Sequence, residues 1–330
     1  MARTSPATGR AGPEGRGRRL AADCLRVVVI AVVYYAGGRL GLLREVTVEG
    51  AVVTPFWPPT GIAVSALLFF GYRAWPGIAI GATLVIWTMA DGLDLSSIGF
   101  VAGNTLAPLL SYALLRRTGF RHQLDRLRDG AGLVFLGAFA GMLISATTGA
   151  LMAVTGGDID PPDFWPVWTA WWAGDVVGVL VVTPLLLAVP RLRRPRGWPA
   201  AAEAVVLMVA TALLSVFATR STVNLLFLVF PLLVWASLRF QLAGSAFCVA
   251  VVSVSATWAA TERTGGFARH SLIEGMISLQ ALNGSAALTA LLLAAVTAEK
   301  RNTLRRIEEA CAELAEMVDR LAPGSRSTRL

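Results

Sequence analysis

Long apolar runs, separated by short polar clusters, follow one another along almost the whole chain of 330 residues. Runs that approach about 20 residues without a charge are typical of membrane-spanning helices. Ten such segments can be marked, at 21–43, 59–71, 74–91, 95–115, 130–153, 165–189, 201–219, 222–238, 241–261 and 272–298. The pattern predicts an all-α integral membrane protein, a polytopic bundle of about ten transmembrane helices.

The second segment leaves an alternative count open. Residues 59–71 are too few to cross about 30 Å of hydrocarbon as a straight helix. The segment can be tilted, re-entrant, or half of a tight hairpin with 74–91 through the sequence GYRAWPG. Without this pair, eight transmembrane helices remain and the orientation is the same.

Composition and charge support a membrane protein and set its orientation. The chain is 55% hydrophobic and 15% charged, whereas a soluble domain has about a quarter charged residues. With the N-terminus inside, 24 of the 29 basic residues fall on the cytoplasmic side, and the external loops DGLD and GGDIDPPD are acidic. The exceptions are Arg44, Arg220, Arg263 and Arg269 outside, and Arg39 within the first span. The positive-inside rule therefore predicts a multi-pass protein of the plasma (inner) membrane, with both termini cytoplasmic. The basic clusters each adjoin an apolar run and form no soluble surface of interleaved basic and aromatic residues, so we expect the lipid bilayer as partner and no nucleic acid.

The two ends of the chain differ from its apolar body. Residues 1–20, rich in Arg, Gly, Pro and Ala, are expected to be a disordered basic cytoplasmic tail, and 323–330 a second disordered tail. Residues 299–322 show an apolar seam at alternating spacings of three and four, typical of a coiled coil. Its members are Leu304, Ile307, Cys311, Leu314, Val318 and Leu321. We expect a cytoplasmic homodimer stalk; the alternative is an amphipathic helix on the membrane surface.

Asp175 is the most unusual polar residue, because it lies inside the apolar segment WWAGDVVGVL. An ionised carboxylate there costs at least about 2.5 kcal/mol, so it should face the bundle interior and have a partner. Arg39, Asn104 and Asn283 are the candidate partners. A ligand or proton site and a structural pair that locks two helices are both open readings.

Further candidate residues for ligand binding lie on three other features. Trp168 and Trp172 form an aromatic face just outward of Asp175, suited to a small organic or cationic ligand, although an interfacial belt explains them equally well. Asn104 and Asn283 are embedded amides, for which helix packing is the alternative role. The helix break FWPPT, with Trp57, Pro58, Pro59 and Thr60, predicts an outer cavity where free N–H groups bind an anion, or simply a capped turn.

Signatures of catalysis are absent from the sequence. The two histidines, His122 and His270, have no partner at metal-ligand spacing, and the three cysteines are scattered. No phosphate-binding loop or nucleophile elbow is present. We therefore expect no enzyme activity, no catalytic residue, no metal and no cofactor.

Four blocks of the sequence resemble, in order, the signatures of the membrane-associated sensor (MASE) domain family, first type. The blocks are WPPTGIAVSALLFFGYRAWPGIAIGA, GNTLAPLLSYALLRR, FWPVWTAWWAGDVVGVLVVTPLLL and FPLLVWASLRF. The resemblance covers about residues 24–298 and implies an integral membrane sensory domain over 21–298. The resemblance does not assign roles to the residues that match the family's motifs. These residues are Trp57, Pro58, Pro59, Thr60, Gly61, Asn104, Trp172, Gly174, Asp175, Gly178 and Pro184.

Domains of this family usually precede histidine kinases or cyclic-di-GMP enzymes, and here we expect no effector domain after the short stalk. The resemblance therefore implies a sensor of an unknown small ligand or membrane state that signals through such a partner in trans. A small-molecule transporter or channel is the alternative function. It would show paired broken helices in two related halves, and the sequence shows one clear break.

Overall fold

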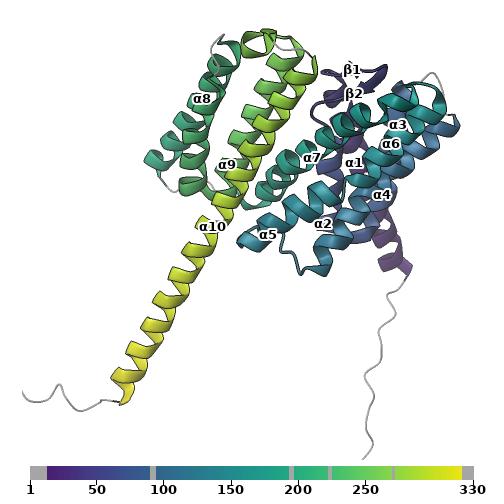
Figure 1. Cartoon of the computed structure of the whole chain (residues 1–330). Helices are drawn as coiled ribbons and strands as arrows, with labels where there is room; N and C mark the ends of the chain where they lie inside the picture. Colours follow the sequence, from purple (N-terminus) through teal and green to yellow (C-terminus); the bar gives the residue numbers. More distant parts are fainter. Residues whose placement is uncertain (1–12, 90–93, 193–196, 222–224, 270–271, 322–330) are drawn as a thin grey trace, which may run out of the picture. The chain divides into compact units, whose positions relative to one another are not determined.

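The structure is a computed structural model that describes residues 13–89, 94–192, 197–221, 225–269 and 272–321, and these are almost entirely helical (Figure 1). The α-helices are α1 (Pro13–Leu42), α2 (Pro58–Phe70), α3 (Trp75–Met89), α4 (Leu95–Arg117), α5 (Leu127–Gly132), α6 (Leu143–Gly156), α7 (Phe164–Ala188), α8 (Trp198–Arg220), α9 (Val229–Thr261) and α10 (Leu272–Leu321). Short 3-10 turns are η1 (Gly71–Ala74), η3 (Pro161–Asp163), η4 (Val189–Arg191), η5 (Leu226–Leu228) and η6 (Gly265–Arg269), and η2 (Leu133–Ala140) is a π-helix. Two strands, β1 (Val46–Val48) and β2 (Ala51–Val53), complete the described chain.

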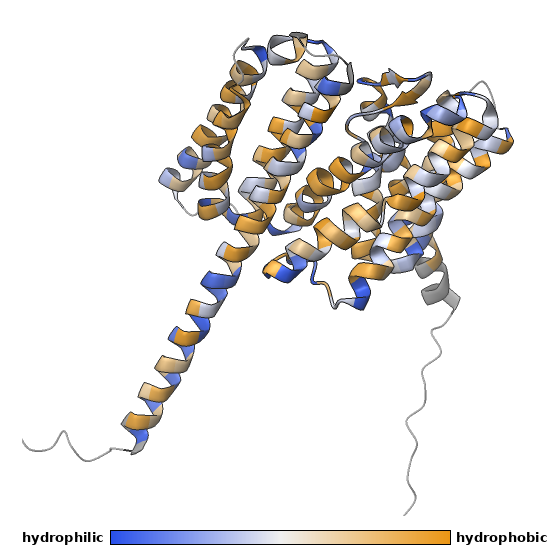
Figure 2. Cartoon of the chain, viewed as in Figure 1, coloured by the Kyte–Doolittle hydropathy of each residue, from blue (hydrophilic) through white to orange (hydrophobic). Residues whose placement is uncertain are grey.

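Eight helices in the described ranges are long and apolar enough to cross a membrane, which confirms the all-α, multi-pass fold and agrees with the alternative count of eight. The spans are Leu20–Leu42, Pro58–Met89, Leu95–Arg117, Leu127–Gly156, Pro161–Arg191, Trp198–Arg220, Leu226–Ala268 and Glu274–Val318. Hydrophobic residues predominate along these spans (Figure 2), and many of the large ones are exposed. Such a surface is suited to lipid, because an apolar surface of this extent is rare on soluble proteins.

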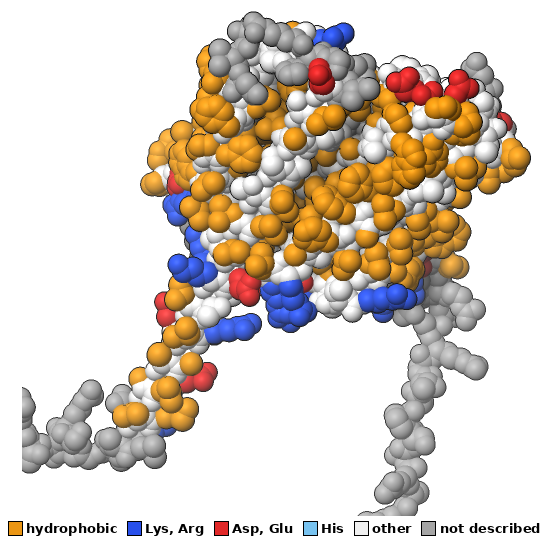
Figure 3. Space-filling view, viewed as in Figure 1, with side chains coloured by type: hydrophobic (Ala, Val, Ile, Leu, Met, Phe, Trp, Pro, Cys, Tyr) orange, Lys and Arg blue, Asp and Glu red, His pale blue; other side chains and the backbone are white. Residues whose placement is uncertain are grey.

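The contact pattern divides the chain into two compact units, which we describe separately. Unit 1 comprises Met1–Leu114 and Gly137–Val179, and unit 2 comprises Leu115–Leu136 and Leu180–Leu330. In unit 1, acidic side chains gather at the end that carries the β-hairpin, and basic side chains at the opposite end (Figure 3).

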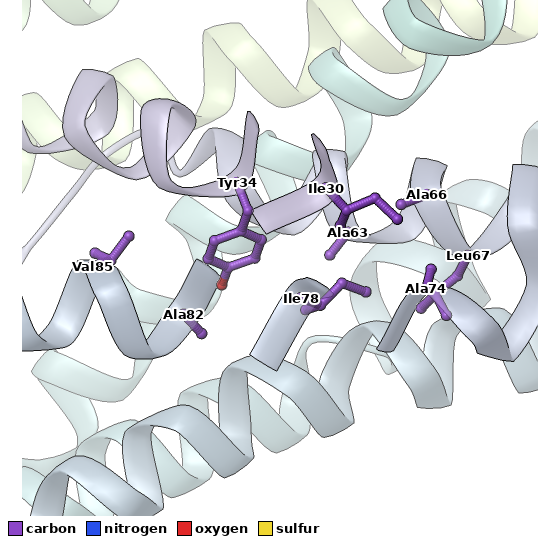
Figure 4. Packing of buried hydrophobic residues seen from close by; sticks show 9 residues of the cluster. All are labelled: Ile30, Tyr34, Ala63, Ala66, Leu67, Ala74, Ile78, Ala82 and Val85. Carbon is purple, nitrogen blue, oxygen red and sulfur yellow. The ribbon is translucent and has the colours of Figure 1, made fainter. Parts of the chain in front are cut away.

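In unit 1, the span Pro58–Met89 reverses direction at η1. Gly41, at the end of α1, lies against the ring of Trp57 at the start of α2, and Gly38 lies against Val85 near the end of α3. Because the start of α2 and the end of α3 both meet the last turns of α1, α2 and α3 run in opposite directions. Small and branched residues fill the space between the three helices (Figure 4). The buried cluster is Ile30, Tyr34, Ala63, Ala66, Leu67, Ala74, Ile78, Ala82 and Val85.

In unit 2, the span Leu226–Ala268 also reverses, at Gln241. The guanidinium of Arg239 pairs with Glu203 near the start of α8 at 2.7 Å. After the reversal, Cys248 lies 3.5 Å from the hydroxyl of Thr211, farther along α8. Gln241 has φ 54° and ψ −142°, a conformation that strongly favours glycine. The sequence count of ten and the structural count of eight therefore differ at these two reversals. Each reversing span, Pro58–Met89 and Leu226–Ala268, was counted as two segments in the sequence.

A short β-hairpin, which the sequence analysis did not expect, joins α1 to α2. The strands are antiparallel, with Val46 opposite Val53 and Val48 opposite Ala51. Glu49 and Gly50 form the turn with positive φ angles of 47° and 92°. Such a two-residue turn is typical of tight hairpins, in which both central residues are left-handed.

The π-helix η2 interrupts the span Leu127–Gly156. Its wider turns leave carbonyl groups that accept bonds from neighbouring helices of unit 1. The Ser111 hydroxyl of α4 donates to the Gly137 carbonyl at 2.6 Å, and the Trp172 indole of α7 donates to the Phe139 carbonyl at 3.0 Å. π segments frequently mark functional positions. This one lies just before α6, the helix that carries Ser145.

The last helix, α10, is continuous over 50 residues and extends beyond α8 and α9 of its own unit (Figure 1). The loop before α5 holds it where the apolar part ends. The Leu127 amide donates to Glu299 at 3.0 Å, and the Asn302 side chain donates to Asp125 at 3.2 Å. We call these two hydrogen bonds the clasp.

The expected tails are only partly described. Residues 1–12 and 322–330 lie outside the described residues. Residues 13–20, expected as part of a disordered tail, are instead helical, because α1 begins at Pro13. Proline fits the first position of a helix, and the following apolar span lets the helix extend back through these residues.

Candidate functional site

Unit 1 contains a cavity of about 430 Å³ that reaches from exposed loop residues to the buried Asp175. Its walls come from β2, the start of α2, the end of α3, the first half of α4, the end of α6 and α7. The mouth carries two exposed carboxylates, Asp94 and Asp158. The described residues of its lining include no Lys, Arg or His.

Asp175 is 1% exposed, and neither of its carboxylate oxygens has a hydrogen-bond partner among the described residues. The Ser145 hydroxyl of α6 is a polar neighbour of this carboxyl group, but the two do not meet the geometry of a hydrogen bond. Arg39, a candidate partner from the sequence, is exposed. An unpartnered carboxylate at this depth is costly, which is the usual mark of a functional group in a membrane protein.

The two tandem prolines begin α2 at its first two positions, where the missing N–H groups cost little. The Trp57 amide donates to the Gly174 carbonyl of α7 at 3.1 Å. The Thr60 hydroxyl donates to the Trp57 carbonyl at 2.8 Å and to the Asp175 carbonyl at 3.1 Å. The helix break thus fastens the start of α2 to the backbone of α7 on both sides of the Asp175 side chain.

Two glycines of α7 make this contact possible. A Cβ atom on Gly174 would lie 2.2 Å from the Thr54 carbonyl oxygen, and one on Gly178 would lie 2.0 Å from that of Trp57. Both distances are far below van der Waals contact. Small residues four apart permit such close approach of membrane segments.

A tyrosine that sequence reasoning missed connects Asn104 to this site. The buried Tyr34 hydroxyl donates to Asn104 Oδ1 at 3.3 Å and lies next to the Trp57 side chain. Asn104 Nδ2 donates to the Phe100 carbonyl at 3.0 Å. Asn104 lines the cavity but does not pair with Asp175. The signal available was a tyrosine in the middle of an apolar run, where its hydroxyl needs a partner.

The aromatic side chains that line the cavity are not the expected pair. Trp57, Trp171 and Phe100 line it, and Trp171 stacks on Phe100 with ring centroids 5.6 Å apart. Trp168 and Trp172 stack on each other at 6.0 Å and are absent from the lining. Their indole N–H groups donate to the Thr147 hydroxyl and the Phe139 carbonyl, which directs both rings towards the helix span that contains η2 and α6.

At the mouth, Asp94 caps the start of α4. The Ser97 hydroxyl, the Ser96 hydroxyl and the Ser97 amide all donate to its carboxylate. These bonds, the one from the Ser97 hydroxyl most of all, lower the pKa of Asp94 to about 2. The carboxylate therefore stays ionised at the entrance throughout the physiological range.

The remaining candidate residues lie on α10, in unit 2. Asn283 is fully buried, and its amide atoms have no partner among the described residues. The seam residues Leu304, Ile307, Leu314 and Val318 are each at least half exposed, and Cys311 is exposed with a free thiol. The side chain of Leu321 lies outside the described residues. No group of three His, Cys, Asp or Glu residues that could hold a metal ion occurs in the described ranges.

Comparison with known proteins gives one match. No curated protein and no solved structure matches the chain. The family model MASE1 matches residues 26–301, which covers most of the chain and includes every wall of the cavity. This family consists of membrane-associated sensory domains. The chain therefore belongs to the MASE1 family of membrane-associated sensory domains.

Proposed function

We propose that the chain is a non-catalytic input module that binds a small ligand in the cavity of unit 1 and signals to a partner in trans. The observation that carries this proposal is Asp175, a buried carboxylate that has no hydrogen-bond partner among the described residues and lies at the end of a cavity that opens among exposed loops. A purely structural carboxylate would be paired, because the pair is what offsets the cost of burial. The partner is a histidine kinase or a cyclic-di-GMP enzyme, as family membership suggests.

The orientation is part of the proposal. We infer that the protein lies in the plasma (inner) membrane with both termini cytoplasmic. The end of unit 1 opposite the β-hairpin carries Arg26 and Arg73. The end with the cavity mouth carries Asp94, just before α4, and Asp158 and Asp160, just after α6. The positive-inside rule places the basic end in the cytoplasm, so the cavity opens to the outside.

One span, interrupted by η2, leads from the cavity wall to residues that contact α10. Ser145 lies next to the Asp175 carboxyl group and belongs to the span Leu127–Gly156. The first residue of that span, Leu127, donates to Glu299 in the clasp, and Gly130 lies against Leu292 of α10. A displacement of this span at Ser145 can therefore reach α10 at the point where the stalk begins.

The stalk pairs with a second copy of the chain. Its apolar seam is exposed in the single chain and continues a helix that is already ordered by the clasp. In a parallel dimer, Cys311 lies on the seam and faces its counterpart. Mild oxidation of native membranes should give a disulfide-linked dimer that is lost in Cys311→Ser. Monomer only, at native expression level, would show that the helix lies on the membrane surface instead.

The same crosslink tests the sensor. In Asp175→Asn, we expect normal abundance in the membrane and a Cys311 crosslinking yield that no longer differs between cells in growth medium and cells washed into buffer. The matched control is Asp160→Asn, an exposed carboxylate that does not line the cavity and should leave the difference intact. A fall in abundance would indicate a structural role. Normal abundance together with a normal difference would contradict the proposal.

One observation favours the alternative of a transporter. Each unit contains a span that folds back on itself, at Gly71 with φ 68° and ψ −161°, and at Gln241 with φ 54° and ψ −142°. Broken helices in corresponding positions of two halves are typical of transporters. A transporter reconstituted in liposomes should accumulate a radiolabelled ligand of the cavity inside the vesicles. With a sensor, the amount of bound radiolabel should depend only on the amount of protein, with no accumulation inside the vesicles.

A further inference from the structure

The charges and hydrogen-bond donors around the cavity indicate what kind of ligand it holds, and this inference rests on the proposed function because the site is the same. Three carboxylates, Asp94, Asp158 and Asp175, line the cavity, and its described lining contains no basic side chain. A cleft of one sign of charge between apolar walls concentrates ions of the opposite sign. The field therefore favours a cation and opposes an anion.

Several of the donors that an anion or a neutral polyol would need are already engaged. Pro58 and Pro59 have no N–H to offer at the start of α2. The Thr60 hydroxyl donates to two backbone carbonyls, and the Asn104 amide donates to Phe100. Both oxygens of Asp175, in contrast, are acceptors without a hydrogen-bond partner among the described residues. A ligand that completes the site must bring donors, which also argues against the anion expected from the helix break.

The walls of the cavity suit an organic cation better than a metal ion. The three carboxylates come from separate elements, and within the described ranges no cluster of three potential ligands is close enough to hold a metal. The walls are instead apolar and aromatic, with Trp57, Phe100 and Trp171 on the cavity. A volume of about 430 Å³ lies within the usual range for sites that hold metabolite-sized molecules.

We propose that this cavity binds a small primary ammonium ion with an apolar body. The ammonium group donates to the free carboxylate of Asp175 and the body lies against the aromatic wall. Burial of Asp175 then no longer leaves a charge without a partner, because the ligand supplies it. Asp94 and Asp158 at the mouth attract the cation but do not hold it.

Three probes that share one skeleton test the class of ligand. Phenethylammonium, phenethyl alcohol and phenylacetate differ at the polar end and carry positive, zero and negative charge. Binding to the full chain in lipid nanodiscs is followed by calorimetry and by tryptophan fluorescence, since Trp57 and Trp171 line the cavity. We expect the ammonium ion to bind at least tenfold more tightly than the alcohol, which is about 1.4 kcal/mol, and no measurable binding of phenylacetate.

Substitutions assign the preference to a residue. Asp175→Asn should weaken ammonium binding at least tenfold and leave alcohol binding within twofold of wild type, whereas Asp160→Asn should change neither. If Asp175→Asn does not fold, Asp158→Asn at the exposed mouth still tests the idea. It should weaken ammonium binding about twofold at low salt and reduce its dependence on salt, because exposed charges are screened.

Two outcomes would overturn the proposal. One is equal or tighter binding of the alcohol or of phenylacetate, and the other is a full ammonium preference in both Asp175→Asn and Asp158→Asn. Neither outcome decides whether the chain is a sensor. If Asp175→Asn still abolishes the medium-dependent change in Cys311 crosslinking, sensing stands and only the ligand class is wrong. If ammonium ions bind but crosslinking never responds, the site stands and the sensor proposal fails.

Discussion

Gly178→Ala tests the contact on which the site is built. A methyl group at this position would lie 2.0 Å from the Trp57 carbonyl oxygen and 2.5 Å from the Thr60 hydroxyl. Normal contact needs more than 3 Å, so the start of α2 must move by about 1 Å or more. It cannot move freely, because the Trp57 amide is bonded to Gly174 and the Thr60 hydroxyl to Asp175.

The expected loss of stability in Gly178→Ala follows from these contacts. Overpacking of a close helix contact costs about 1–3 kcal/mol, and loss of the Thr60 bond to Asp175 about 0.5–1.5 kcal/mol more. Alanine in a helix interior recovers about 0.5–1 kcal/mol relative to glycine. The net destabilisation is about 0.5–4 kcal/mol. At about 2–4 °C per kcal/mol for a unit of this size, the apparent melting temperature should fall by roughly 1–16 °C.

Thermal unfolding in detergent, followed by tryptophan fluorescence and by loss of the monodisperse peak on size exclusion, measures this shift. Gly284→Ala is the matched control, because Gly284 is also within a helix but has no atom within 4 Å of the added methyl group. It should melt at or slightly above the wild-type temperature. If Gly178→Ala melts together with Gly284→Ala, the backbones of α2 and α7 do not approach as described, and the geometry around Asp175 is wrong.

Four further predictions concern other parts of the chain. Reporters fused after Gly157 and after Leu330 should report opposite compartments, and a result on the same side would refute the orientation. Asn302→Ala removes one bond of the clasp and should reduce the medium-dependent change in stalk crosslinking without lowering abundance; an unchanged response would exclude the clasp as the route. Gln241→Gly relieves a left-handed conformation and should raise the stability of unit 2 by about 1–2 kcal/mol in thermal unfolding, whereas a loss would mean that the glutamine side chain stabilises the turn. The carboxylate of Asp94 has a lowered pKa, so its cap stabilises α4 above its ordinary pKa of 3.8 and is lost as pH falls through about 2, which amide exchange of the first turn of α4 should show.

The fold class was predictable because every span must satisfy its own backbone in lipid, and long apolar runs record that requirement directly. Where spans reverse is a subtler property. The turn at Gly71 carries glycine and a flanking Trp-Pro, and the sequence pointed to it. The turn at Gln241 carries none of the residues that usually permit a positive φ, so tertiary packing against α8 decides it. The β-hairpin was missed because its strands are only three residues long.

The site was predictable at its charged centre and not in its surroundings. Asp175 stands out in any apolar run, and Trp57 and Thr60 were marked by the helix break. Which groups surround Asp175 depends on the rotation of each helix about its own axis, which composition does not fix. For this reason Trp171 lines the cavity while the expected Trp168 and Trp172 do not.

The arrangement of hydrogen bonds around Asp175 also indicates which wall of the site responds to a ligand. The backbone of α7 is fixed on both sides of the side chain, by Trp57 at Gly174 and by Thr60 at Asp175 itself. The facing wall is also bonded to α7, by the Trp172 indole at the Phe139 carbonyl and by the Trp168 indole at the Thr147 hydroxyl. Between these two bonds, the Ser145 hydroxyl has no hydrogen-bond partner among the described residues, and the π-helix η2 precedes it in the same span. We therefore expect a ligand on the carboxylate to act first on the turn at Ser145. Because the same span supplies Leu127 to the clasp, this turn is where we expect the route to α10 to begin.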